Sequence, residues 1–390
     1  MLLGSAQKDG PADVKQTYDV AVVGAGFAGC LTAIALGRAG HSVVVIEANP
    51  TVPNVFRAEK VGGDQLHLLA ELGLLDDFKA AATPVRKFIN IRGRHIVDIR
   101  DVEEYGLHYS EIISLLRARI PENVIFKLGH VDDIVASADV QQIVLGEGET
   151  LAARLVVIAT GYGKTLLRKL GFESVVVHEQ PTICAGFSLQ PPPSGFRFPA
   201  LAAYGERRGD NLDYISIFPM GEVMRGNLFM FTNIRDPRLI ALRERGAEGL
   251  FELLPGLRSW LHDSGWVGDV SLFPVELSRY ENGVRDGIVV VGDAFRTSCP
   301  SVGSGLSCAL MDVVCLRSLF SDWLQTPGMN AAKIATFYNA PRKKLRDESA
   351  QRLAFQRRHT VNDTSRAGEL RQTAYYFARG MRDRLRRLAS

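Results

Sequence analysis

The stretch that decides the fold covers residues 18–50 and reads YDVAVVGAGFAGCLTAIALGRAGHSVVVIEANP. Residues 19–23 form a continuous β-prone run, as expected of a strand that is buried on both faces. A glycine-rich turn follows, then an Ala- and Leu-rich segment that predicts a helix through Leu36, and a second buried strand over residues 42–46. This strand–helix–strand opening indicates the α/β class.

The turn between the first strand and the helix has the pattern G-x-G-x-x-G, in the context that a dinucleotide-binding motif requires. The predicted contacts in it are Gly24, Gly26, Phe27, Ala28 and Gly29. The first glycine permits a tight turn, the second lets a pyrophosphate approach the backbone, and the third allows close packing of helix on strand. The helix N-terminus then offers free N–H groups and the positive end of its dipole to the phosphates.

Glu47 closes the second predicted strand, about 20 residues after the glycine motif, and Ala48 follows it as a further predicted contact. The Glu47 carboxylate can accept hydrogen bonds from both hydroxyls of an adenosine ribose. A 2′-phosphate at this position would be repelled, because two anions would meet. The first site therefore suits FAD or NAD rather than NADP.

The composition fits a soluble globular protein, since 46% of the 390 residues are hydrophobic and 23% are charged. The formal net charge of +3 is too small to favour nucleic acid as a partner. Charge is uneven, however: residues 341–390 hold 14 Lys and Arg against 5 Asp and Glu, a local +9 that leaves −6 for the rest. We expect a solvated face of C-terminal helices; an anionic lipid, nucleic acid or acidic partner is the alternative.

The cysteines are scattered and form no Cys-x-x-Cys pair, so the sequence predicts no metal site. They are Cys30, Cys184, Cys299, Cys308 and Cys315. This usage favours a reducing compartment. The residues before Tyr18 resemble a mobile leader rather than a secretion signal, and no run of 18 apolar residues predicts a membrane span. We therefore expect a cytoplasmic location.

The character of the chain changes after Gly171, where β-prone runs with frequent Gly and Pro predict a mostly antiparallel sheet. Residues 288–291 return to a buried strand of the parallel type. The predicted fold is thus a three-layer dinucleotide-binding domain with an inserted sheet domain and C-terminal helices. Its predicted ranges are 18–85, 105–171 and 285–325 for the cofactor domain, 86–104 and 172–284 for the substrate domain, and 326–390 for the helical region.

A second motif decides which dinucleotide the chain takes. Residues 287–295 read GIVVVGDAF, and a helix is predicted from Leu306. This run resembles the "GD" fingerprint of FAD-dependent monooxygenases of the aromatic-hydroxylase type, similar to p-hydroxybenzoate hydroxylase. Asp293, Pro300 and Gly305 match residues of the family's motif, and Gly292 and Gly303 beside them are further predicted cofactor contacts.

The resemblance implies a role for each part of this second motif. Asp293 would hold the ribityl chain of FAD, and the backbone N–H groups of Leu306 and Ser307 would meet the flavin carbonyl. A helix N-terminus suits that position, because it stabilises the negative charge that reduced flavin carries.

Three further positions extend the resemblance, which covers residues 18–320. Arg57 and Tyr109 stand where the family contacts FAD, although Gln or Arg is more usual at the second. Gly161 belongs to a stretch similar to the family's "DG" motif, in which Thr160 replaces the usual Asp. That motif serves both FAD and NADPH in the family. The chain carries no second G-x-G-x-x-G after a strand, and the family likewise has no separate nicotinamide domain.

The resemblance implies that NADPH or NADH reduces FAD and that reduced flavin reacts with O₂ to a C4a-hydroperoxide, which oxygenates a small electron-rich organic substrate. An FAD-dependent reductase of isoprenoid double bonds is the first alternative. A flavin halogenase is another, but its usual Trp-x-Trp-x-x-Pro segment is absent from this sequence. A flavin-binding module without activity is the third. Oxygen-dependent consumption of NAD(P)H discriminates among these functions.

The substrate side rests on weaker signals in the inserted sheet. Tyr214 and Phe218 share one face of a predicted strand and are candidates for a pocket wall, with ordinary sheet packing as the alternative. Arg225, close to two glycines, is read as a hairpin-tip residue, or alternatively as a clamp for a substrate carboxylate. Pro300 and Val302 belong to the loop expected along the flavin ring, so we expect the substrate between that loop and the sheet.

Overall fold

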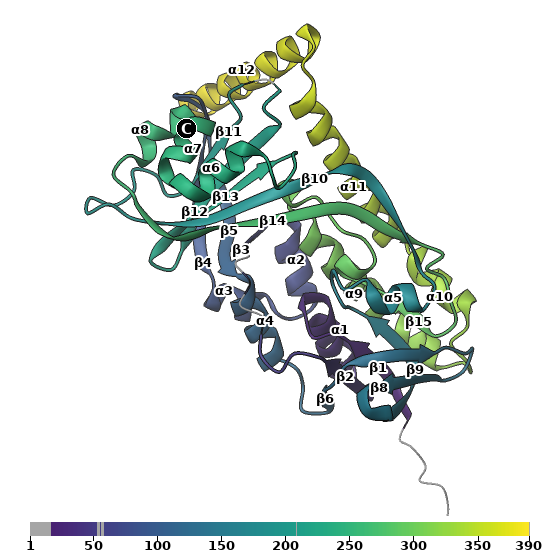
Figure 1. The fold of residues 1–390 in the computed structure, drawn as a ribbon. Helices are drawn as coiled ribbons and strands as arrows, with labels where there is room; N and C mark the ends of the chain where they lie inside the picture. Colours follow the sequence, from purple (N-terminus) through teal and green to yellow (C-terminus); the bar gives the residue numbers. More distant parts are fainter. Residues whose placement is uncertain (1–16, 53–54, 56–57, 208, 390) are drawn as a thin grey trace, which may run out of the picture.

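The computed structural model describes residues 17–52, 55, 58–207 and 209–389, apart from a few side chains. Arg57, one of the predicted cofactor contacts, lies outside this part of the chain. Two sheets organise the described residues, and helices pack on both of them (Figure 1). The α/β class and a mostly antiparallel second sheet are confirmed.

The first sheet has seven strands in the order β6-β2-β1-β9-β8-β7, with β15 beside β9. They are β1 (Thr17–Val23), β2 (Val43–Glu47), β6 (Val124–Leu128), β7 (Val131–Val135), β8 (Gln141–Leu145), β9 (Thr150–Ile158) and β15 (Ile288–Val290). β1 pairs in parallel with β2 and β9, and β15 extends the parallel part. These central strands are buried on both faces, which explains their continuous apolar runs.

Helices cover one face of this sheet, and on the other face α5 packs in one apolar cluster with residues of β7 and β8, two strands of the same sheet. The helices are α1 (Phe27–Arg38), α4 (Tyr109–Ala118), α9 (Gly305–Leu324) and α10 (Ala331–Tyr338), and α5 spans Thr165–Lys169. The 3-10 turns at Gly146–Gly148, Gly292–Ala294 and Pro300–Val302 interrupt the connections. Of the helices in the described ranges, none combines the length and apolarity that crossing a membrane requires.

The second sheet has eight strands in the order β14-β10-β13-β12-β11-β4-β5-β3, antiparallel except for β4 and β11. They are β3 (Ala58–Gly62), β4 (Thr83–Arg92), β5 (His95–His108), β10 (Glu173–Gln190), β11 (Leu201–Tyr204), β12 (Leu212–Met220), β13 (Val223–Met230) and β14 (Gly265–Glu281). The long strands β10 and β14 run from this sheet towards the first (Figure 1). Helices α2 (Asp64–Glu71) and α3 (Leu75–Ala81) lie between β3 and β4 in the chain.

Two features of this region differ from the expected domain ranges. β3 lies inside the range predicted for the cofactor domain, yet it pairs with β5 in the second sheet. Helices α6 (Pro237–Arg245), α7 (Ala247–Leu253) and α8 (Arg258–Leu261), with a 3-10 turn at Pro255–Leu257, were not predicted within the sheet domain. Each is short, so its hydrophobic period is hard to recognise, and all pack on one face of the sheet. The exact domain boundaries stay a prediction.

The C-terminal helices α11 (Pro341–Asn362) and α12 (Arg366–Ala389) cross the opposite face of the second sheet (Figure 1). Several of their basic groups pair with carboxylates elsewhere in the chain, and some of these pairs are buried, which corrects the expectation of a solvated face. The ion pairs join Arg342 to Glu71, Lys343 to Asp312, Arg346 to Asp64, Arg357 to Asp213 and Arg379 to Asp98. The negative remainder of the chain thus supplies the carboxylates that hold these helices in place.

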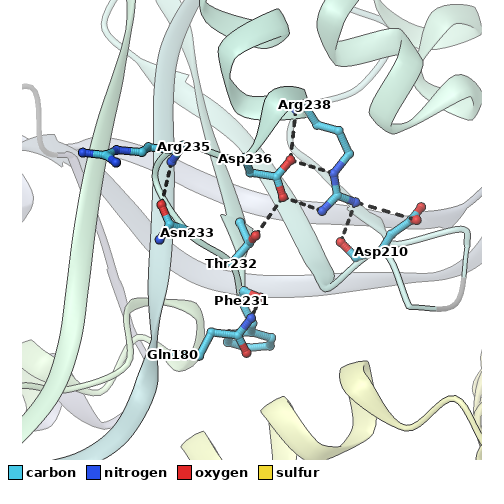
Figure 2. A network of polar contacts seen from close by, with 8 residues as sticks. All are labelled: Gln180, Asp210, Phe231, Thr232, Asn233, Arg235, Asp236 and Arg238. Atoms are coloured by element: carbon cyan, nitrogen blue, oxygen red, sulfur yellow. Dashed lines mark hydrogen bonds and ion pairs between the residues drawn. The ribbon is translucent and has the colours of Figure 1, made fainter.

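Asp236 fixes the start of α6 and its link to the sheet (Figure 2). As N-cap residue it accepts a hydrogen bond from the backbone N–H of Arg238 at 3.0 Å. The Arg238 guanidinium binds the same carboxylate through Nε at 2.9 Å and Nη2 at 2.6 Å, and the Thr232 hydroxyl donates to it at 2.7 Å. Hydrogen bonds from Arg238 and Thr232 lower the pKa of Asp236 to about 2.

We expect Asp236→Ala to lower the free energy of unfolding by about 1–2 kcal/mol at neutral pH, because the cap and the bidentate contact are both lost. Asp236→Asn keeps a capping acceptor and should lose less. The folded-state pKa lies below the unfolded value, so the Asp236 contribution is complete above the unfolded value of 3.8 and is lost as pH falls towards about 2. Urea unfolding at several pH values measures this; a difference between wild type and Asp236→Ala that grows on acidification contradicts it.

Candidate functional site

A cavity of about 420 Å³ opens at the carboxyl ends of β1, β2 and β9. It brings together most of the residues predicted to contact a dinucleotide. Its lining includes Gly24, Gly26, Phe27, Ala28, Glu47, Ala48, Tyr109, Gly161, Gly292, Asp293, Gly305 and Leu306. Parallel strands end at this edge, and it is where open α/β sheets bind their ligands.

Each of the three glycines in the first motif is required for a different structural reason. Gly24 has a φ of +100°, and a Cβ there would lie 2.7 Å from the carbonyl oxygen of Ala159. A Cβ on Gly29 would overlap the Gly24 carbonyl at 1.8 Å, so helix and strand touch here, and Gly29 itself does not line the cavity. At Gly26 a Cβ would meet only the Tyr109 hydroxyl, at 3.6 Å. Gly26 thus leaves its backbone open for a ligand to approach.

The Glu47 carboxylate is fixed at one end of this cavity. Its Oε2 accepts from the backbone N–H of Ala25 at 2.6 Å, and its Oε1 accepts from that of Asn49 at 2.8 Å. Arg117, on α4, lies with Nη2 3.6 Å from Glu47 and donates through Nε to the Ala25 carbonyl at 3.3 Å. The sequence did not reveal Arg117 or Asn49 as cavity residues; the only signal for Arg117 is its helical spacing from Tyr109.

The second motif forms a turn held from behind by a buried ion pair. Gly292 has a φ of +61°, and its N–H donates to Oδ2 of Asp312 at 2.8 Å. The ammonium group of Lys343 binds the other oxygen of that carboxylate and lies 3.2 Å from Asp347. Burial lowers the pKa of Lys343, but the two carboxylates outweigh burial and raise it, so the group stays charged. Sequence reasoning missed both Asp312 and Lys343.

Asp293, presented by this turn, stands at the junction of two cavities. A smaller space of about 90 Å³ shares Asp293, Gly305 and Leu306 with the larger cofactor cavity. Pro300 and Gly303 line the smaller space only, while Ser307 is buried and its hydroxyl accepts from Gln65 Nε2 at 3.2 Å. The first turn of α9 contains no acidic residue, and its positive dipole end faces this junction.

Arg225 lies in the smaller cavity, and its reading as a hairpin-tip residue is wrong. The turn between β12 and β13 is at Gly221, whereas Arg225 is the third residue of β13, opposite Phe218. Its side chain is only 1% exposed and crosses Gly186, where a Cβ would lie 2.1 Å from Nη2. Nε donates to Oδ1 of Asn227 at 3.0 Å. Burial lowers the pKa of Arg225 to about 10, which still leaves it a cation at neutral pH.

A third cavity, of about 730 Å³, lies between the second sheet and the helices α11 and α12; we call it the roofed chamber. Its lining includes Asn90, Tyr204, Tyr214, Ser216, Ser301, Val302, Arg357, Gln372, Tyr375 and Tyr376. The Tyr204 ring lies 6.0 Å from that of Tyr214 and 5.2 Å from that of Tyr376. The Arg357 guanidinium covers the rings of both Tyr204 and Tyr214 and pairs with the buried Asp213 at 2.6 Å.

One wall separates the roofed chamber from the smaller cavity. Tyr214 donates its hydroxyl to the carbonyl oxygen of Ser301 at 2.9 Å, and its ring packs 5.1 Å from that of Phe229, which lines the smaller cavity. Phe218 does not share this wall. It lies under Gly106 of β5 in an apolar cluster with Phe88 and lines none of the three cavities, which corrects its place among the pocket candidates.

The residues present fit FAD: a fixed carboxylate, an open glycine backbone at a helix N-terminus, and an aspartate leading to a second helix N-terminus. The chain matches the family model described as FAD binding domain over residues 17–344. It is 26% identical over 345 residues to squalene epoxidase 4 of Arabidopsis thaliana, covering 81% of this chain and 64% of that protein. Squalene monooxygenase of Mus musculus is 24% identical and matched over 78% of this chain and 55% of its own length.

A third relative, kynurenine 3-monooxygenase of Flavobacterium johnsoniae, is 23% identical over 87% of this chain and 79% of its own. The chain thus spans about 55–64% of the length of the squalene-oxidising relatives. In fold it is similar to p-nitrophenol 4-monooxygenase from Pseudomonas putida, with a TM-score of 0.76, 21% identity and coverage of 94% and 95%. The chain belongs to the FAD binding domain family, and its resemblance to FAD-dependent monooxygenases of the aromatic-hydroxylase type is confirmed.

Proposed function

We propose that the protein is an FAD-dependent monooxygenase that uses NADH or NADPH and O₂ to oxygenate a small, electron-rich organic molecule. The observation that carries the proposal is the alignment of three cavities around one loop. The cofactor cavity leads past Asp293 into the smaller cavity, and the roofed chamber lies across the segment of Ser301 and Val302. The names of the three relatives, an epoxidase and two monooxygenases, support the same reaction class.

Different residues of the chain would bind different parts of FAD. Glu47 would hold the adenosine ribose, the backbone at Gly26 and the start of α1 would hold the pyrophosphate, and Asp293 would hold the ribityl chain. The first N–H groups of α9, at Leu306 and Ser307, would meet the flavin carbonyl. When bound and reduced by NAD(P)H, FAD supplies the electrons that let one oxygen atom of O₂ enter the substrate while the other leaves as water.

The protein's remaining tasks are to position the substrate and to exclude water. Residues 298–307 contain no Asp, Glu, His or Lys, so this loop offers backbone groups rather than an acid or base to the reacting atoms. We place the body of the substrate in the roofed chamber, between Tyr214 and Val302, because a volume near 730 Å³ suits an organic ligand. Arg225 would clamp an anionic group brought to the smaller cavity, where its buried charge gives a strong hydrogen bond.

The reductant and the location complete the proposal. The sequence has no second dinucleotide motif, so NADH or NADPH would visit the flavin transiently and then leave. All five cysteines lie within the described part of the chain and are present as thiols rather than disulfides. This supports the predicted cytoplasmic location, since cysteines stay reduced there.

Asp293→Ala is expected to weaken FAD binding by about 10- to 150-fold, the cost of losing a hydrogen bond to a charged group. The FAD affinity of Asp293→Asn should lie between those of the wild type and Asp293→Ala, because asparagine keeps an acceptor but loses the charge. Flavin fluorescence on titration of apoprotein measures the dissociation constant. Asp101→Ala is a matched control, since this aspartate is 91% exposed and lines none of the three cavities.

A colourless protein that takes up NAD but not FAD would contradict the cofactor assignment. The function itself is tested with FAD-loaded protein in a substrate screen that follows NAD(P)H and O₂ together. A monooxygenase consumes them in equal amounts when its substrate is present. Substrate reduction without O₂ would favour the double-bond reductase, and no consumption with any substrate would favour a binding module.

A further inference from the structure

Helix α12 has two chemically different faces, and the inner one holds it to the second sheet. Arg379 donates through Nε to Asp98 at 2.7 Å, Arg92 donates to Gln372 at 3.1 Å, and the backbone N–H of Ile99 donates to Asp383 at 3.3 Å. Gln372, Arg379 and Asp383 recur at helical spacing and therefore share one side of the helix. The position of α12 is thus fixed, and so is the direction of its other face.

The outer face of α12 carries an exposed apolar stripe. Leu370 is 71% exposed, Phe377 70%, Met381 41% and Leu385 60%, and Ala374 is exposed between them. Steps of seven, four and four residues keep these side chains in one line along a helix. A contiguous row of large apolar side chains in water marks an interaction surface rather than ordinary exposure.

Arginines flank the stripe on both sides. Arg366 and Arg384 lie along one edge and Arg382 lies along the other, and all three are exposed. We infer that the α12 stripe docks on an anionic lipid surface, with the helix lying flat and its apolar side chains inserted between the headgroups. An apolar stripe bordered by basic residues is the pattern that such interfacial helices share.

The charges favour this occupant over a second copy of the chain. Two copies of α12 packed stripe to stripe would bring arginine edges against arginine edges in either direction, and the like charges would repel. An anionic membrane surface attracts the same edges, because each basic residue near it gains free energy. The inference is independent of the proposed oxygenation, since it uses only the outer face of α12.

The test uses the full-length, FAD-loaded protein with vesicles of phosphatidylcholine alone and vesicles containing about 30% phosphatidylserine. Co-sedimentation should show binding to the anionic vesicles that weakens several-fold when ionic strength rises from about 0.1 to about 0.5 M. The double variant Phe377→Gln with Leu385→Gln removes apolar contact without changing charge and should reduce the affinity at least about tenfold. Arg382→Gln with Arg384→Gln should reduce it on anionic vesicles only.

Thr373→Gln is the matched control, since Thr373 is exposed on α12 but lies off the stripe, and it should bind as the wild type does. Unchanged FAD content and melting temperature verify that each variant is folded. Equal vesicle binding by wild type and the Phe377→Gln, Leu385→Gln variant would overturn the inference. A dimer in light scattering that this variant dissociates, with no vesicle binding by the wild type, would overturn it in favour of self-association.

Discussion

Lys343→Met is expected to lower the free energy of unfolding by about 3–5 kcal/mol, because it leaves a carboxylate buried without its counter-charge. Asp312 and Lys343 are 2% and 1% exposed, so water cannot replace the lost ammonium group. Methionine is similar in size and keeps the packing against Phe295 and Phe337, over which Lys343 now lies. The loss therefore reports the unpaired charge rather than a cavity.

The same substitution is expected to weaken FAD binding, since Asp312 also holds the N–H of Gly292 and so the turn that presents Asp293. Denaturant unfolding of the FAD-free protein separates the effect on stability from the effect on the cofactor. Lys344→Met is the control, because Lys344 is the exposed neighbour on the same helix. Adding Asp312→Asn to Lys343→Met should restore part of the stability, since the buried charge is gone. If Lys343→Met lowers the free energy of unfolding no more than Lys344→Met does, the Asp312–Lys343 pair does not stabilise the fold in this way.

The cofactor half of the fold was predictable because its signals are local. The local structure at the glycine motif, at Glu47 and at the buried strand before Asp293 can be predicted from a few consecutive residues. The structure gathers them around one cavity, because parallel strands end at a common edge. Tyr109 joins them from 62 or more residues away along the chain, and only the family resemblance indicated that position.

The substrate half depends on contacts that a single sequence does not state. Arg225 was misread because glycines nearby suggested a turn, whereas Gly186 on the neighbouring strand makes room for the buried guanidinium. Phe218 shares a strand face with Tyr214, but β5 covers it. The roof of the chamber comes from α11, whose Arg357 reaches Asp213 from a distant part of the chain. The basic composition of α11 alone could not distinguish a buried, paired side chain from a solvated one.

Val302→Trp is expected to reduce substrate-stimulated turnover by about a hundredfold or more, with FAD content nearly unchanged. Val302 ends the 3-10 turn at Pro300–Val302, and it lines the roofed chamber but neither of the two cavities that meet at Asp293. An indole at this position would fill the space opposite Tyr214, where we place the substrate. The cofactor contacts at Glu47 and Asp293 would remain as they are.

Three measurements on the purified variant decide this prediction: the FAD-to-protein ratio, NAD(P)H consumption with substrate, and hydrogen peroxide release. Val302→Ala is the control, because it alters the same position without filling it and should keep most of the turnover. Leu353→Trp, at the roof end of the chamber, should reduce turnover less, since Leu353 is 50% exposed and the added ring can turn outward. Normal turnover by Val302→Trp would mean that the substrate reaches the flavin from another side, and the assignment of the roofed chamber would then be wrong.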